Sequence, residues 1–288
     1  MTVLEIKRRI DNAKAIDFGT IFNDSVELFK KVWVQGLVTL LLNMVLAIPV
    51  VILIYIPLIF LGFLDLYASS TNDAYSGDYA TSGVGPFMIV VMIVLYFLAI
   101  AAISTIGVAL RAALYRICKL KDLEQMGKED YFYFFKKPYL IKSIKLGLTI
   151  VGLSVAAAMF YLVIFFYLIL GGTDSFVSFP LMLLSFLPLI YIAIPLIYVV
   201  VIYAFNPDKS ISEIIKLGFS LGKKKWLITF GLLFVSSLLA GIVGLIMCGV
   251  GVYVTASFSN LPSYFIYKDV VGFDNEDETR QIEENVTF

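Results

Sequence analysis

The chain has 288 residues, of which 60% are apolar and only 15% are charged, and its mean hydropathy is +0.92. A soluble domain is typically about 45–50% apolar, so these values exclude an ordinary soluble globular protein. The 22 Lys and Arg residues balance the 22 Asp and Glu residues, and a net charge of zero gives no reason to expect a nucleic-acid partner.

The apolar residues are gathered into long blocks that carry almost no charge. A helix needs about 20 such residues to cross the hydrocarbon core of a bilayer. The pattern predicts an all-α, polytopic membrane helical bundle with six spans, at about 34–64, 84–110, 143–170, 177–205, 226–247 and 249–267. Gly249 and Gly251 suggest a tight turn between the last two spans, although one bent or re-entrant segment would also fit.

The spans divide the chain into one membrane domain and a tail. We expect residues 1–271 to form a single transmembrane domain. Residues 272–288 are rich in Asp and Glu, and we expect them to form a disordered cytoplasmic tail.

Charged residues are distributed unevenly between the two sides of these spans. Every Lys and Arg falls before span one, between spans two and three, between spans four and five, or after span six. The opposite side carries Asp65, Asp73, Asp78 and Asp174 instead. Because short loops rich in Lys and Arg stay in the cytoplasm, we expect both termini to be cytoplasmic.

The pattern Lys-Lys-x-aromatic occurs three times, each time at the entry to an odd-numbered span. Lysine side chains extend to lipid headgroups, and Trp and Tyr favour the interface, so these residues are predicted to anchor the spans there. The recurrence also indicates three repeated two-span units, although interface chemistry alone would give the same pattern. The predicted interface anchors are Lys30, Lys31, Trp33, Lys136, Lys137, Tyr139, Lys223, Lys224 and Trp226.

The segments that precede these motifs are amphipathic. Residues 18–33 alternate apolar and polar side chains at helical spacing, and Ser210 with Glu213 has the spacing of a capping box. Asp130 is placed to begin a short aromatic helix over 131–135. We expect three helices in the cytoplasmic interface; the alternative is that the segments simply extend the spans into water.

Small residues and prolines mark two further features of the spans. In the fifth span, Ser237 with Gly241 and Ala240 with Gly244 form two small-residue faces, which are typical of close helix packing. The first and fourth spans contain several prolines, which tend to kink a helix.

The spans contain essentially no ionisable residue at depth, and the chain has no histidine. We therefore predict no catalytic, metal or cofactor site, and expect that the protein is not an enzyme. A lipid-active enzyme would need a carboxylate at interface depth, for which Asp65 and Asp122 are the candidates. Asn43 and Asn260 are expected to make intramembrane polar contacts with neighbouring helices or to line a polar cavity.

The chain resembles a known group of proteins at both ends. The start, Phe18-Gly19-Thr20-Ile21-Phe22…Ser25…Leu28-Phe29-Lys30-Lys31…Trp33, and the close, Leu261-Pro262-Ser263-Tyr264-Phe265-Ile266-Tyr267-Lys268-Asp269, are similar to a group of six-span bacterial membrane proteins. That group is related to the membrane domain fused to some glycerophosphodiester phosphodiesterases. The resemblance implies the topology of a bacterial inner-membrane protein, and no phosphodiesterase activity because the chain has no such catalytic domain.

These observations lead to one functional hypothesis and one alternative. We expect a non-enzymatic accessory, scaffold or regulatory subunit of an inner-membrane complex, such as secretion, insertion or transport machinery. Its partners would be the lipid bilayer and another membrane protein. The alternative is a transporter or flippase-like protein for an amphiphile or a small uncharged solute, because discontinuous helices often frame substrate sites.

Overall fold

The computed structural model describes residues 1–71, 86–170, 175–247 and 250–273, and these residues contain helices and no strands. A short helix of nine residues precedes the first long helix. In chain order the elements are α1 (Val3–Asp11), α2 (Phe18–Thr71), α3 (Pro86–Asp122), the 3-10 helix η1 (Tyr133–Phe135), α4 (Lys137–Leu170), α5 (Ser175–Leu184), α6 (Leu187–Phe205), α7 (Ile211–Lys224), α8 (Trp226–Ile246), α9 (Val250–Thr255), the 3-10 helix η2 (Phe258–Asn260) and α10 (Leu261–Val270).

Five segments among the described residues are long and apolar enough to cross a membrane, which agrees with a multi-pass membrane protein. They are Phe18–Pro57, Val90–Asp122, Lys137–Leu168, Pro180–Phe205 and Trp226–Ile246. The first five predicted spans each overlap one of these segments. The sixth predicted span does not appear as a single long helix, so the six-span topology stays a prediction.

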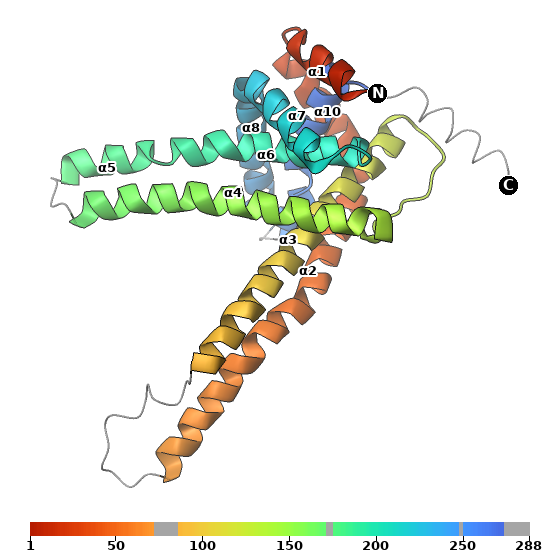
Figure 1. The fold of residues 1–288 in the computed structure, drawn as a ribbon. Helices are drawn as coiled ribbons and strands as arrows, with labels where there is room; N and C mark the ends of the chain where they lie inside the picture. Colours follow the sequence, from red (N-terminus) through yellow and green to blue (C-terminus); the bar gives the residue numbers. More distant parts are fainter. Residues whose placement is uncertain (72–85, 171–174, 248–249, 274–288) are drawn as a thin grey trace.

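The helices form three antiparallel hairpins that meet at one end of the molecule (Figure 1). The first hairpin is α2 with α3, the second is α4 with α5 and α6, and the third is α8 with the returning segment from α9 to α10. The first two hairpins diverge from each other as they leave their common end (Figure 1). The threefold sequence repeat stays a prediction, because the three hairpins differ in length and in their breaks.

The hydrophobic core lies where the hairpins meet, and we call this region the hub. It consists of α1, α7 and α10 together with the first part of α2, the second half of α3, η1, the start of α4 and the second half of α6. Every Lys and Arg lies in or beside the hub except Arg280, which is outside the described residues. The outer parts of the hairpins carry exposed apolar side chains, such as Ile56, Phe97 and Val163, which are 58%, 68% and 66% exposed.

The first hairpin begins earlier than predicted. The backbone N–H of Thr20 donates to Asp17 Oδ2 at 2.8 Å, which caps the helix at its start. From there α2 runs without interruption for 54 residues. The predicted interfacial helix over 18–33 is therefore not a separate element, because no helix-breaking residue separates it from the span. Pro49 and Pro57 both lie inside α2.

An amphipathic helix, α7, follows the second hairpin. The capping box predicted at Ser210 and Glu213 is confirmed, with both reciprocal hydrogen bonds present at the start of α7. Ile214, Leu217 and Leu221 bury the apolar face of α7, and α7 packs against α6. In the segment 131–135 only the short η1 forms, so of the three predicted interfacial helices α7 alone is a full separate helix.

Small residues allow the third hairpin to pack closely. Thr255 donates its hydroxyl to the Ala240 carbonyl at 3.1 Å, and a Cβ built at Gly251 would lie 3.0 Å from Gly244 Cα. The Ala240–Gly244 face of α8 is therefore a packing face, as predicted. Ser237 and Gly241 are exposed, so the second predicted face has no neighbour among the described residues.

The returning segment is broken into α9, η2 and α10 rather than forming one helix. A Cβ built at Gly36 of α2 would lie 2.1 Å from Ser257 Oγ, so α2 and the returning segment touch at this point. Beyond it, α10 enters the hub, where Tyr264 and Ile266 are fully buried. The two ends of the described chain meet there, since Arg9 Nη1 donates to the Val271 carbonyl at 2.5 Å.

Candidate functional site

A cleft of about 190 Å³ opens on the hub between the start of α2, the second half of α10 and the end of α3. Charged residues of both signs surround an apolar floor made by Leu28 and Phe265. The residues that line it are Asp24, Glu27, Leu28, Lys31, Asp122, Phe265 and Lys268.

Asp122 joins two sides of this cleft. Its Oδ2 accepts hydrogen bonds from the Tyr264 hydroxyl at 2.7 Å and from Lys268 Nζ at 2.6 Å. Both donors belong to α10, so the carboxylate at the end of α3 fixes the last helix to the first hairpin. Asp122 is one of the two carboxylates that a lipid-active enzyme could use. In the structure this carboxylate is held between the Lys268 ammonium and the Tyr264 hydroxyl.

The other lining charges are divided between paired and unpaired groups. Lys31 Nζ lies 2.9 Å from Glu124 Oε1, and this hydrogen bond lowers the pKa of Glu124 below its usual value. Asp24 and Glu27 form no ion pair within the described part of the chain. Burial and the nearby Asp24 charge raise the pKa of Asp269. Lys268 Nζ lies 5.4 Å from the centre of the Phe265 ring, so the protein's own ammonium group already occupies the cation–π position in this cleft.

Metal binding finds little support in the described residues. No group of three or more His, Cys, Asp or Glu side chains there is arranged to hold a metal ion. Asp65 lies within α2, but its side chain is outside the described structure, as are Asp73, Asp78 and Asp174.

Three pairs of buried hydroxyl groups tie the helices of the hub together. Tyr115 pairs with Ser263 at 2.9 Å and joins α3 to α10. Tyr203 pairs with Ser143 at 2.9 Å and joins α6 to α4. A third pair, Tyr198 with Thr229 at 2.7 Å, joins α6 to α8. Because a buried hydroxyl without a partner costs about 1–3 kcal/mol, these pairs favour one arrangement of the helices.

The predicted interface anchors occupy different environments. In the first motif, Lys30 and Trp33 are exposed and Lys31 pairs with Glu124. In the second, Lys137 is exposed and Lys136 lies 2.5 Å from Asp130. Tyr139 in this motif stacks on Tyr133, with ring centroids 4.9 Å apart. Their role at a membrane interface stays a prediction.

The third motif is partly buried in the protein. Lys223 and Lys224 are exposed, but Lys225 is buried and donates to the Lys14 carbonyl. Trp226 is half-buried and stacks on Phe230 at 5.3 Å between ring centroids. Its indole nitrogen is buried without a hydrogen-bond partner.

Asn43 and Asn260 are not brought together. Asn43 lies seven residues beyond Gly36 in the outward direction of α2, whereas Asn260 follows Ser257 toward the hub. The two amides therefore lie on opposite sides of the point where Gly36 meets Ser257. Both side chains are half-buried, and neither forms a side-chain hydrogen bond within the described residues.

Sequence reasoning missed the hydroxyl pairs and the cleft. Tyrosines within apolar spans are visible in the sequence, but their partners lie 31 to 148 residues away. Nothing in the spacing of Tyr115 and Ser263 links them. Asp24 and Glu27 fall on the polar side of the amphipathic segment 18–33 in the sequence, but their convergence with Asp122 and Lys268 depends on helix packing.

No family model matches the chain, and no match was found among curated proteins or solved structures. The similarity to the six-span bacterial group therefore stays an expectation drawn from the residues at the two ends of the chain.

Proposed function

We propose that this protein is a non-enzymatic scaffold or accessory subunit that assembles with another membrane protein in a bacterial inner membrane. The observation that carries the proposal is the combination of a well-packed hub with two apolar hairpins that diverge from it (Figure 1). Helices of a self-contained bundle pack along their length. Here the outer parts of the hairpins expose large apolar side chains, which suits contact with lipid and with the helices of a partner.

The exposed small-residue face of α8 supports this proposal. Ser237 and Gly241 lie one turn apart and are exposed, and a Cβ at Gly241 would meet no atom of the described chain within 4 Å. Small residues at this spacing let a second helix approach closely in a membrane. A partner helix on α8 would use this face.

The test is purification of the tagged protein in mild detergent from cells that express it at its native level. We expect another membrane protein to co-purify, and Gly241→Leu to reduce its recovery. Gly152→Leu is the matched control, because Gly152 is also exposed on a helix with no atom near its Cβ position. Recovery of a lone monomer from wild-type cells, or equal loss in both variants, would count against the proposal.

We also propose six crossings with both termini cytoplasmic. The returning segment runs antiparallel to α8 and carries the chain back to the hub, and the basic residues gather at this same end. Reporter fusions after Lys14 and after Phe273 should then report the same side of the membrane. Opposite sides would mean that the segment from α9 to α10 does not complete a crossing.

The alternative function is a transporter or flippase-like protein. Two discontinuous segments favour it: the break between α5 and α6, and the returning segment of α9, η2 and α10. Cysteines at Asn43 and Asn260 discriminate between the two functions. Labelling of both by a membrane-impermeant reagent indicates a water-filled path, whereas protection of both indicates packing.

A further inference from the structure

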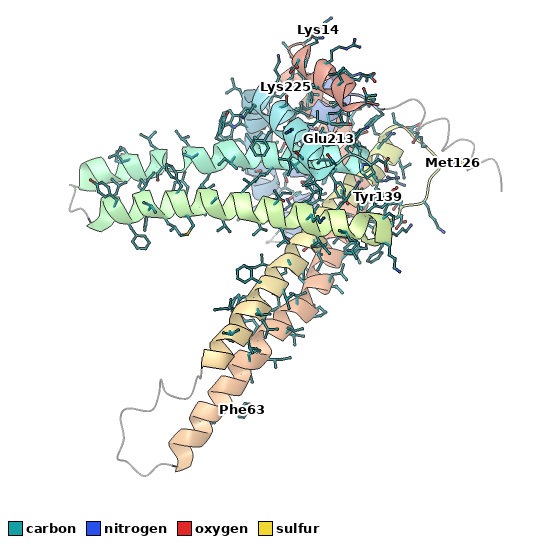
Figure 2. The ribbon with its side chains drawn as sticks, viewed as in Figure 1. Lys14, Phe63, Met126, Tyr139, Glu213 and Lys225 are labelled. Atoms are coloured by element: carbon teal, nitrogen blue, oxygen red, sulfur yellow. The ribbon has the colours of Figure 1, made fainter. Side chains whose placement is uncertain are left out.

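The end of the hub farthest from the outer end of the first hairpin brings together cations from two distant parts of the chain. Lys224 Nζ donates to the Asp11 carbonyl at 2.9 Å, and Lys225 Nζ donates to the Lys14 carbonyl. These bonds hold the end of α7 against the end of α1. Figure 2 shows Lys14 and Lys225 at this end of the molecule, with Phe63 near the opposite end.

The exposed face of α1 extends this basic surface. Ile6 and Ile10 are fully buried and fix the orientation of the helix. Leu4, Lys7 and Arg8 are exposed and share one face, because residues three and four apart are neighbours on a helix. We define the α1–α7 surface by Lys7, Arg8, Lys14, Lys223 and Lys224.

These cations lack carboxylate partners within the described chain. Lys7, Arg8, Lys14 and Lys223 form no ion pair there, and Lys224 bonds to a backbone carbonyl. Around the cleft and the loop after α3 the situation differs, since Lys31, Lys121 and Lys268 each pair with a carboxylate. Burial, and next the charge of Lys224, lower the pKa of Lys225. The exposed Asp11 and Asp17 flank Lys14 in sequence, and against them the five cations leave the α1–α7 surface with an excess of positive charge.

The position of the α1–α7 surface indicates which class of anion binds to it. The basic run ends at Lys225, and Trp226 begins a segment that is long and apolar enough to cross a membrane. Leu227 is 78% exposed and Leu4 is 80% exposed, so apolar side chains flank the cations. Cations placed at headgroup depth beside exposed apolar groups are typical of binding to anionic lipids.

We propose that the α1–α7 surface binds the phosphate-bearing headgroups of anionic phospholipids in the leaflet that faces the hub. This interaction goes beyond the scaffold function and does not depend on the identity of a protein partner. Lys7, Arg8, Lys14 and Lys223 supply the charge, while Leu4 and Leu227 contact the acyl region next to the headgroups.

The experiment compares binding of phosphatidylglycerol and phosphatidylcholine to the full-length, detergent-solubilised protein by native mass spectrometry. The test variant carries Lys7→Gln, Arg8→Gln, Lys14→Gln and Lys223→Gln. The matched control carries Arg111→Gln, Lys128→Gln, Lys145→Gln and Lys216→Gln, four exposed cations elsewhere on the hub that also form no ion pair in the described structure.

Each cation near an anionic lipid surface strengthens binding about fivefold at low salt. We therefore expect wild-type protein to prefer phosphatidylglycerol, the test variant to lose at least about tenfold in affinity for it, and the control to keep the preference. No preference in the wild type, or equal loss in both variants, would overturn the proposal. If the protein binds phosphatidylglycerol only after removal of residues 274–288, the acidic tail and not lipid occupies the α1–α7 surface in the full-length protein. That result would also overturn the proposal.

Discussion

The contact between Gly36 and Ser257 allows a direct test of how the returning segment packs on α2. A Cβ at position 36 would lie 2.1 Å from Ser257 Oγ and 2.3 Å from Ser257 Cβ. Overpacking of this severity costs about 3 kcal/mol, and replacing a helical Gly by Ala returns about 1 kcal/mol. We expect Gly36→Ala to destabilise the protein by about 2 kcal/mol, which lowers Tm by about 4–8 °C.

A second substitution should reverse this loss. Ser257→Gly removes both atoms that the new methyl group would meet, and it removes a buried hydroxyl without a hydrogen-bond partner. We expect Ser257→Gly alone to change the free energy of unfolding by less than about 1 kcal/mol. Combined with Gly36→Ala, it should restore most of the wild-type Tm, because the two positions share one space.

Thermal unfolding in detergent can be followed through the reactivity of Cys118, which is fully buried. A Cys248→Ser background leaves it as the single thiol. Gly152→Ala is the control, since no atom lies near its Cβ position, and it should raise Tm slightly or leave it unchanged. If Gly36→Ala behaves like Gly152→Ala, or if Ser257→Gly fails to rescue it, the returning segment does not pack on α2 as described.

Three further predictions follow from packing, hydrogen bonding and charge. Gly218→Ala should lower the free energy of unfolding by about 1–3 kcal/mol in the same assay, because the new Cβ would lie 2.7 Å from the α6 backbone; a neutral result would mean that α7 does not rest on α6. Tyr203→Phe should destabilise the protein more than Tyr198→Phe, since the Tyr203 hydroxyl has two partners and the Tyr198 hydroxyl has one; the reverse order of Tm values would contradict the hydrogen-bond assignment. Hydrogen bonds from the Thr20 backbone N–H and hydroxyl lower the pKa of Asp17 below its usual value. The cap therefore contributes its full stability above the unfolded-state pKa and loses it as the pH falls through the lower, folded-state pKa. Asp17→Asn should therefore weaken the acid dependence of Tm below about pH 4, and an unchanged profile would refute the effect.

The division of the chain into apolar helices with a basic end could be predicted from the sequence. Long uncharged blocks have no stable place in water, and charged residues are excluded from the hydrocarbon core, so both features follow from local composition. The capping box of α7 was also readable, because Ser210 and Glu213 interact over three residues. The Ala240–Gly244 packing face followed from the same kind of short spacing.

Only the tertiary structure decided what converges on the hub. An apolar block specifies that a segment is a helix, but its neighbours depend on side-chain packing between segments that lie up to 148 residues apart in sequence. The pairing of Tyr115 with Ser263 and the clamp of Asp122 on α10 are of this kind. So is the joining of Lys14 to Lys225, which places two basic segments on one surface. Periodicity along the chain carries no record of such contacts, because each depends on how two helices meet in space.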